Sequence, residues 1–221
     1  REISLNVTDD LVDDLSAEDL NNIKAVYSDK DAFYLLSLPV SNKVYCFDMR
    51  TSLQNGSART TVWPSYSPKS FCYTRSKELL LGMQQFIGKY DGYLDNTSTY
   101  RVKYYTNYFD FDQPTTSKIL KKINLVAIGG SAQPIAIKYG FDYTFNPLSQ
   151  VVVLNGATVY EYGIAEYGIA EYSTGVALEN IKANVGGAGK VLQLGFESDI
   201  DGDPLSIQKI DFALKAGRTM M

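Results

Sequence analysis

Residues 189–221 read GKVLQLGFESDIDGDPLSIQKIDFALKAGRTMM. Apolar and polar residues alternate along two runs in this stretch, 191–200 and 205–214, which is typical of strands with one buried face. The pair Asp201-Gly202 lies between the runs and readily adopts the positive φ angles of a tight turn. The stretch therefore predicts a β-hairpin in an antiparallel sheet.

Residues 96–221 repeat this pattern in a series of long strands. Three prolines, Pro114, Pro134 and Pro147, lie near the predicted strand ends, where a missing N–H group costs little. Long strands joined by turn residues are typical of an antiparallel β-sandwich. We expect such a sandwich over residues 96–221, with strands at 100–111, 117–128, 133–139, 151–153, 158–172, 175–184 and in the hairpin.

Shorter strand-like runs fill residues 32–90, and each is bounded by Asp, Asn, Gly, Pro or Ser. Short runs at close spacing predict an antiparallel meander. A segment rich in Asp, Asn, Thr and Gly follows at residues 91–98, so we expect two units, 1–95 and 96–221. The strands predicted in the first unit are 32–38, 43–48, 60–63, 70–73, 78–83 and 86–90.

A short helix is predicted before the meander. Ser16 offers an N-cap that acidic residues follow, and Leu20 and Ile23 recur at helical spacing. Thr8 offers a second N-cap, for a short turn that runs through Leu15. With strands everywhere else, the predicted fold class is all-β.

The composition is that of a globular chain. Of the 221 residues, 45% are hydrophobic and 21% are charged, so the chain can bury one large core or two small ones. The net charge of −4 is a poor match for a phosphate backbone, so we do not expect sequence-specific DNA binding. No run approaches the roughly 18 consecutive apolar residues that a membrane-spanning helix needs.

Histidine is absent, which removes the usual general base, the usual zinc ligand and the Ser-His and Cys-His pairs of many hydrolases. The two cysteines, Cys46 and Cys72, alternate with aromatic neighbours and are expected to be buried free thiols. We therefore expect no enzyme activity, no catalytic residue, no metal site and no cofactor.

Two segments partly match ligand-binding motifs, and both fail. Residues 199–203 have the spaced carboxylates of a calcium loop, but Pro204 and Ile210 stand where that loop needs glycine and an acid. Residues 186–190 end in Gly-Lys as a phosphate loop does, but Val191 replaces the required Ser or Thr. We expect a turn at the first segment and a flexible β-loop at the second.

A five-residue unit, Tyr-Gly-Ile-Ala-Glu, is duplicated from Tyr162 to Glu171 and followed by Tyr172. In a strand, an odd repeat alternates faces, so Tyr162 and Tyr172 would lie on one side and Tyr167 on the other. The duplication is either a local repeat without a role or an arm that contacts a neighbouring subunit through tyrosines, which interfaces favour. The three tyrosines are our candidates for a subunit interface.

Several segments together resemble the tail nozzle proteins of short-tailed bacteriophages, also called tubular tail or phage stabilisation proteins. Residues 189–221 resemble the C-terminal strands of that family. Residues 104–111 and the lysine-bearing strand at 118–123 resemble its platform domain. Five segments, in this order, resemble one propeller blade of the family: residues 33–39, 43–48, Trp63, 79–82 and 88–91. The predicted helix before them also matches the family, in which a short helix precedes the blade.

The resemblance implies a fold of β-propeller-type blades in residues 1–95 and a platform-like antiparallel β-sandwich in residues 96–221. It implies a structural virion protein of the phage tail, assembled in the host cytoplasm as a homo-oligomeric ring that is hexameric in the family. The ring would dock on a tail adaptor ring, with tail fibres or spikes as further partners. Its channel would retain and eject the genome, and DNA would pass without sequence-specific binding.

The family's chains are longer than this one, and Arg1 stands where an initiator methionine would, so we expect a fragment or a processed product. Two other functions remain open. A β-sandwich rich in Tyr and Asn also suits a carbohydrate-binding, adhesin-like module. The second is a propeller glycosidase, although no segment singles out the pair of catalytic carboxylates that such an enzyme needs.

Overall fold

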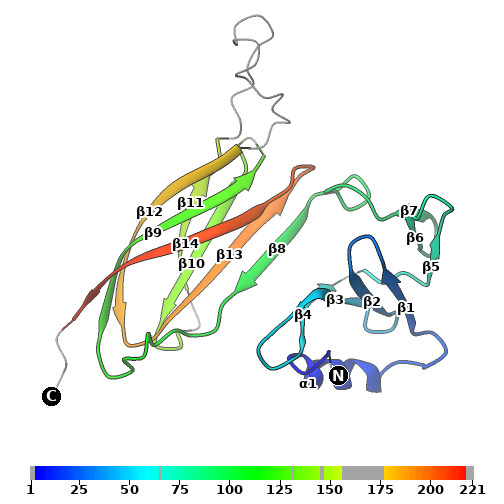
Figure 1. Ribbon diagram of the computed structural model, residues 1–221, viewed down its shortest axis with the longest axis horizontal. Helices are drawn as coiled ribbons and strands as arrows, with labels where there is room; N and C mark the ends of the chain where they lie inside the picture. The colour runs from blue at the N-terminus through cyan, green and yellow to red at the C-terminus, as the bar shows by residue number, and fades with distance from the viewer. Residues whose placement is uncertain (1–2, 65, 131, 145–146, 156–176, 218–221) are drawn as a thin grey trace, which may run out of the picture. The chain divides into compact units, whose positions relative to one another are not determined.

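The computed structural model describes residues 3–64, 66–130, 132–144, 147–155 and 177–217 (Figure 1). Among them, one short helix accompanies strands that form four antiparallel sheets. The prediction of an all-β fold is confirmed. The chain divides into two compact units, Arg1–Asp91 and Gly92–Met221.

The first unit combines the helix with two sheets. Helix α1 spans Thr8–Ser16. One sheet is a four-stranded meander of β1 (Lys24–Ser28), β2 (Phe33–Leu38), β3 (Lys43–Ser52) and β4 (Ala58–Pro64). The other sheet contains β5 (Ser70–Tyr73), β6 (Leu79–Gly82) and β7 (Ile87–Lys89).

Alternation along β2 and β3 places apolar side chains on both faces of the meander, so both faces are covered. On one face, Leu38 and Phe47 pack against Leu11 of α1. On the other face, Leu35 packs in a cluster that contains Leu81 of β6. The first unit is therefore built in three layers, with the four-stranded sheet in the middle.

The prediction of a helix that begins at Ser16 is wrong. Ser16 is the last residue of α1, and β1 already begins at Lys24. The helical spacing of Leu20 and Ile23 misled the prediction, because Leu20 is 80% exposed and gives a helix nothing to bury there. The helix lies instead at the second predicted site, but Thr8 is its first helical residue and Val7 is the N-cap, without a side-chain cap hydrogen bond. Leu11 is the residue that the helix buries.

The expected blade is only partly matched. Strands β2, β3 and β4 are neighbours in the predicted order, and Trp63 lies in β4, half-buried and stacked on Tyr90. The predicted fourth strand, β6, belongs to the other sheet, and β1 completes the meander instead. Leu79 and Leu81 both bury their side chains against the face of the meander, which a strand at its edge could not do.

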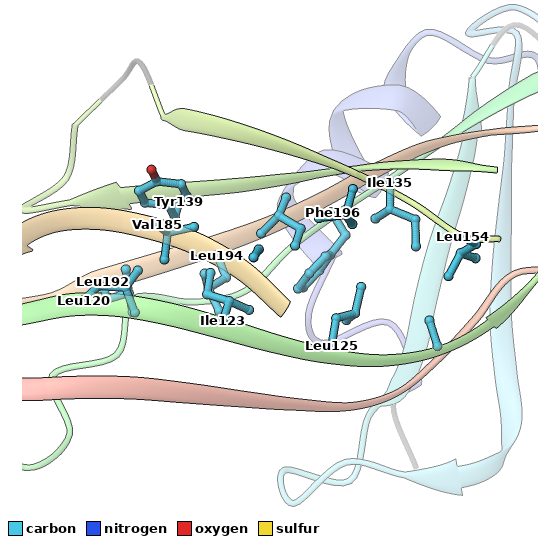
Figure 2. Packing of buried hydrophobic residues seen from close by; sticks show 14 residues of the cluster. Leu120, Ile123, Leu125, Ile135, Tyr139, Leu154, Val185, Leu192, Leu194 and Phe196 are labelled. Carbon is cyan, nitrogen blue, oxygen red and sulfur yellow. The ribbon is translucent and has the colours of Figure 1, made fainter. Parts of the chain in front are cut away.

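The second unit is an antiparallel sandwich. One sheet has the order β11-β10-β13-β8 and the other β12-β9-β14. Leu125, Ile135, Leu194 and Phe196 are among the buried residues that fill the single core between the sheets (Figure 2). The strands are β8 (Tyr100–Tyr105), β9 (Lys118–Gly129), β10 (Pro134–Phe141), β11 (Leu148–Val153), β12 (Ala177–Gly189), β13 (Leu192–Ile200) and β14 (Ser206–Ala216).

The predicted hairpin of residues 191–214 is wrong in its pairing. Strand β13 lies between β10 and β8, whereas β14 pairs with β9 in the other sheet. The predicted tight turn is replaced by a bend at residues 201–203, in which Gly202 has φ 84° and the chain passes from one sheet to the other. Phe196 of β13 and Phe212 of β14 thereby reach the same core from its two sides.

The predicted flexible loop at residues 186–190 is also wrong. Gly187 and Gly189 belong to β12 and pair with β9, beyond a bulge that shifts the register after Asn184. Gly187 has φ 153°, and a Cβ atom there would lie 2.2 Å from the ring of Phe141. These glycines are therefore required for close packing and not for flexibility.

Candidate functional site

The predicted interface tyrosines, Tyr162, Tyr167 and Tyr172, lie outside the described residues, so that prediction stays untested. Within the described part of the chain, no group of three His, Cys, Asp or Glu side chains is placed to hold a metal ion. No helix in that part is long and apolar enough to cross a membrane. The candidate site described next is a pair of sheet edges in the second unit.

The first edge is strand β8, whose six residues are all exposed. Tyr100, Val102 and Tyr104 pair across the ladder with Ile200, Ser198 and Phe196 of β13, whose side chains are all buried. Residues directly opposite each other in an antiparallel pair project to the same face of the sheet. The three apolar side chains therefore lie on the core side of the sheet and are nevertheless exposed to solvent.

The exposure of β8 follows from the number of strands in each sheet. Within the described residues, the sheet that contains β8 has four strands and the facing sheet has three. Strand β8 therefore extends beyond the cover of the facing sheet, and Tyr104 is 59% exposed. Among the described residues no strand pairs with the outer side of β8. An apolar stripe at such an edge is a surface that proteins usually protect or pair.

The second edge is strand β11, at the opposite side of the same sheet. Its sequence, LSQVVV, contains no charged residue. Leu148, Val151 and Val153 are all exposed, and Val151 is 55% exposed. Proteins usually place lysine, proline or a bulge on a free edge to prevent pairing, and none of these occurs in β11.

The two edges match in length and in direction. Strands β8 and β11 contain six residues each. Three antiparallel pairings separate them, so they run in opposite directions. If β11 of one copy lay beside β8 of the next, the antiparallel order of the sheet would continue without interruption.

The charges of β8 lie on the outer face of the sheet. Arg101 bonds Glu197 at 2.8 Å and Asp199 at 3.1 Å, and the Tyr105 hydroxyl donates to the same Glu197. The hydrogen bond from Tyr105, followed by that from Arg101, lowers the pKa of Glu197. The same bond raises the pKa of Tyr105 to about 12. Arg101 is thus paired within one copy, and Lys103, the other cation of β8, projects to the same outer face opposite Glu197.

The tyrosine-rich strand predicted at 100–111 contains β8, but the sequence did not identify it as the edge of a sheet. Its tyrosines gave a signal for an interface, but exposure depends on how many strands the facing sheet contains. No signal singled out β11, because a run such as LSQVVV reads equally well as an internal strand.

The comparisons with known proteins identify no relative: no protein-family model and no curated protein sequence matches the chain.

Proposed function

We propose that this chain is a structural subunit of the distal tail nozzle of a short-tailed bacteriophage. In this proposal, copies of the chain form a ring-shaped channel that docks on the tail adaptor ring and retains or ejects the genome. The resemblance of several segments to the nozzle family is the reason for choosing this function among all-β proteins. The protein acts through assembly and is not an enzyme.

One observation carries the proposal: among the described residues, the β11-β10-β13-β8 sheet ends in two strands, β8 and β11, that expose apolar side chains and run in opposite directions. Contacts of β8 with β11 of the next copy are heterologous, because each copy uses two different surfaces. Such head-to-tail contacts generate a closed ring when the rotation between copies closes. The edges therefore support a ring of identical subunits.

The net charge of −4 supports a channel through which DNA moves. A wall of lysine and arginine would bind phosphates and release counterions, and that binding would oppose movement. A weakly acidic wall does not bind the backbone in this way. The proposed DNA contact is thus transient and independent of sequence.

The assembly is tested by sedimentation velocity over a concentration series. We expect the wild-type chain to form a discrete oligomer and Val151→Lys to sediment as a monomer, because a desolvated lysine would interrupt the β11 edge. Val12→Lys is the matched control, since Val12 in α1 is 57% exposed, close to the value for Val151. This control should assemble as the wild type does.

A wild-type chain that stays monomeric at every concentration would contradict the proposal and would favour the adhesin-like alternative. Equal oligomers of the wild type and Val151→Lys would retain assembly but exclude the β11 edge from the contact. The region that contains Tyr162, Tyr167 and Tyr172 would then be the next one to substitute.

A further inference from the structure

A hollow of about 450 Å³ opens on the second unit. It lies where the outer face of strands β8 and β13 meets residues 143–144 and Pro147, which follow β10. Three tyrosine rings dominate its wall. The lining residues are Tyr105, Tyr108, Tyr143, Thr144, Pro147 and Gln193.

Tyr105 is held in one position at the floor of the hollow. Its ring lies over Gly195, where an added Cβ atom would be 2.4 Å from the ring. Its hydroxyl donates to Glu197, which is itself bonded to Arg101. Gly195 under the ring and the Glu197 carboxylate at the hydroxyl therefore fix the ring of Tyr105, which remains exposed to solvent.

Tyr143 stands in an unfavourable backbone position. Asp142 has φ 49° and Tyr143 has φ 61°, and the N–H of Thr144 donates to the carbonyl oxygen of Phe141 at 3.0 Å. Two positive φ angles inside a bonded four-residue turn define a type I′ turn, which favours Gly, Asn or Asp at its centre. A bulky tyrosine there is strained, and it is also 65% exposed, so packing in the core does not explain it.

The turn is nevertheless anchored by hydrogen bonds and a ring contact. A carboxylate oxygen of Asp142 accepts hydrogen bonds from the backbone N–H groups of Lys190 at 2.7 Å and Val191 at 3.1 Å. The ring of Tyr108 lies 4.4 Å from that of Tyr143, centroid to centroid, at an interplanar angle of 44°. The hollow thus presents rings that are oriented before any ligand arrives, which reduces the entropy cost of binding.

The polar groups of the hollow are neutral. The side-chain amide of Gln193 donates to the carbonyl oxygen of Thr106 at 3.0 Å, which fixes the side chain. Its own carbonyl oxygen can act as an acceptor. The hydroxyl groups of Tyr108 and Tyr143 add donors and acceptors, and that of Thr144, which donates to the carbonyl oxygen of Phe141, adds an acceptor. None of the lining residues is charged.

We propose that this hollow binds a neutral saccharide built of pyranose units. The C–H groups of a pyranose carry a slight positive charge and stack on the negative face of an aromatic ring, while its hydroxyl groups bond neutral amides and hydroxyls. A nucleotide would need lysine or arginine for its phosphate, and the lining contains neither. The inference goes beyond the proposed function and does not depend on assembly.

Saturation-transfer difference NMR tests the site on the full chain with the methyl α- and β-pyranosides of glucose, galactose and mannose. We expect transfer to at least one of these sugars. Tyr143→Gly should weaken that binding about tenfold. The same substitution should leave the thermal midpoint unchanged or higher, because glycine relieves the strain of the turn. Tyr93→Ala, which removes an exposed tyrosine outside the hollow, is the matched control and should bind as the wild type does.

Each other outcome overturns the inference. Absence of transfer to all of these sugars would exclude a saccharide site, and equal binding by Tyr143→Gly or equal loss in Tyr93→Ala would place any binding elsewhere. A fall in the thermal midpoint of Tyr143→Gly would make the ring a structural group. A change in its sedimentation without sugar binding by the wild type would make the hollow a contact between subunits. If the chain forms a ring but binds no sugar, only the saccharide inference is contradicted. If the chain binds sugar but stays monomeric, only the proposed nozzle function is contradicted.

Discussion

Asp14 is the residue that ties α1 to the first sheet. Its carboxylate accepts hydrogen bonds from Lys43 at 2.8 Å and from Tyr45 at 2.6 Å, and the ring of Tyr45 is buried. Burial alone would raise the pKa of Asp14, but the hydrogen bonds from Lys43 and Tyr45 outweigh it, so the pKa is lowered from 3.8. The ionised form of Asp14 therefore stabilises the folded state of the first unit.

Asp14→Asn should lower the free energy of unfolding of the first unit by roughly 1–2 kcal/mol at neutral pH, since Lys43 is partly exposed and screened. A lowered pKa stabilises the fold above the unfolded-state value and loses that effect as pH falls through the folded-state value. The difference from the wild type should therefore shrink below about pH 4. Urea unfolding followed by Trp63 fluorescence measures it, because Trp63 is the single tryptophan and lies in this unit.

Asp13→Asn is the control for this prediction, because Asp13 is an exposed neighbour in the same helix. It should unfold as the wild type does at both pH values. A loss in Asp14→Asn that stays constant from neutral to acidic pH would show that the carboxylate charge does not stabilise the helix contact.

The two cysteines differ, and the prediction that both are buried is wrong. Cys46 is half-buried and Cys72 is exposed. Burial, followed by the charge of Asp48, raises the pKa of the Cys46 thiol to about 11. Cys72 lies in β5, which is an edge strand of its sheet. An edge strand can leave side chains exposed even when aromatic residues flank them.

Ellman's reagent at about pH 8 should therefore modify one thiol rapidly in the native protein. The second thiol should react only in denaturant, and Cys72→Ser should abolish the rapid phase. Two rapid phases, or a rapid phase that survives Cys72→Ser, would contradict this assignment.

At the scale of elements, the alternation of apolar and polar residues predicted the positions of most of the described strands. The run at 70–73 coincides with β5, and the run at 117–128 lies within one residue of β9. Alternation says which face of a strand is buried but not which strand is its neighbour. For this reason β13 and β14 looked like a hairpin, although they face one core from two sheets.

Gly187 is the position at which β12 depends most on a small residue. Gly187→Ala should cost roughly 2–4 kcal/mol in the free energy of unfolding, because the new methyl group would meet the ring of Phe141 in a strained backbone conformation. Gly186→Ala is the matched control, since a Cβ atom at Gly186 has no neighbour within 4 Å. Urea unfolding followed by tyrosine fluorescence compares the two variants, and equal stability would contradict the packing described for Phe141.

At the scale of the whole molecule, each unit has its own core, and the proposed contact between copies involves only the second unit. Composition and the absence of histidine pointed to a protein that acts through binding or assembly. The exposed stripe of Tyr100, Val102 and Tyr104 could not be predicted, because it arises from the difference between the four strands described in one sheet and the three described in the other. The hollow could not be predicted either, because its tyrosines, Tyr105, Tyr108 and Tyr143, come from separate segments that meet only in the folded chain.

Negative-stain electron microscopy of the purified chain tests the central claim most directly. We predict closed rings of uniform size for the wild type and for Val12→Lys. We predict single particles for Val151→Lys, because the β11 edge can no longer continue the sheet of the next copy. Wild-type particles that remain single at concentrations where Val12→Lys also remains single would contradict the account, and rings formed by Val151→Lys would contradict the assignment of the β11 edge.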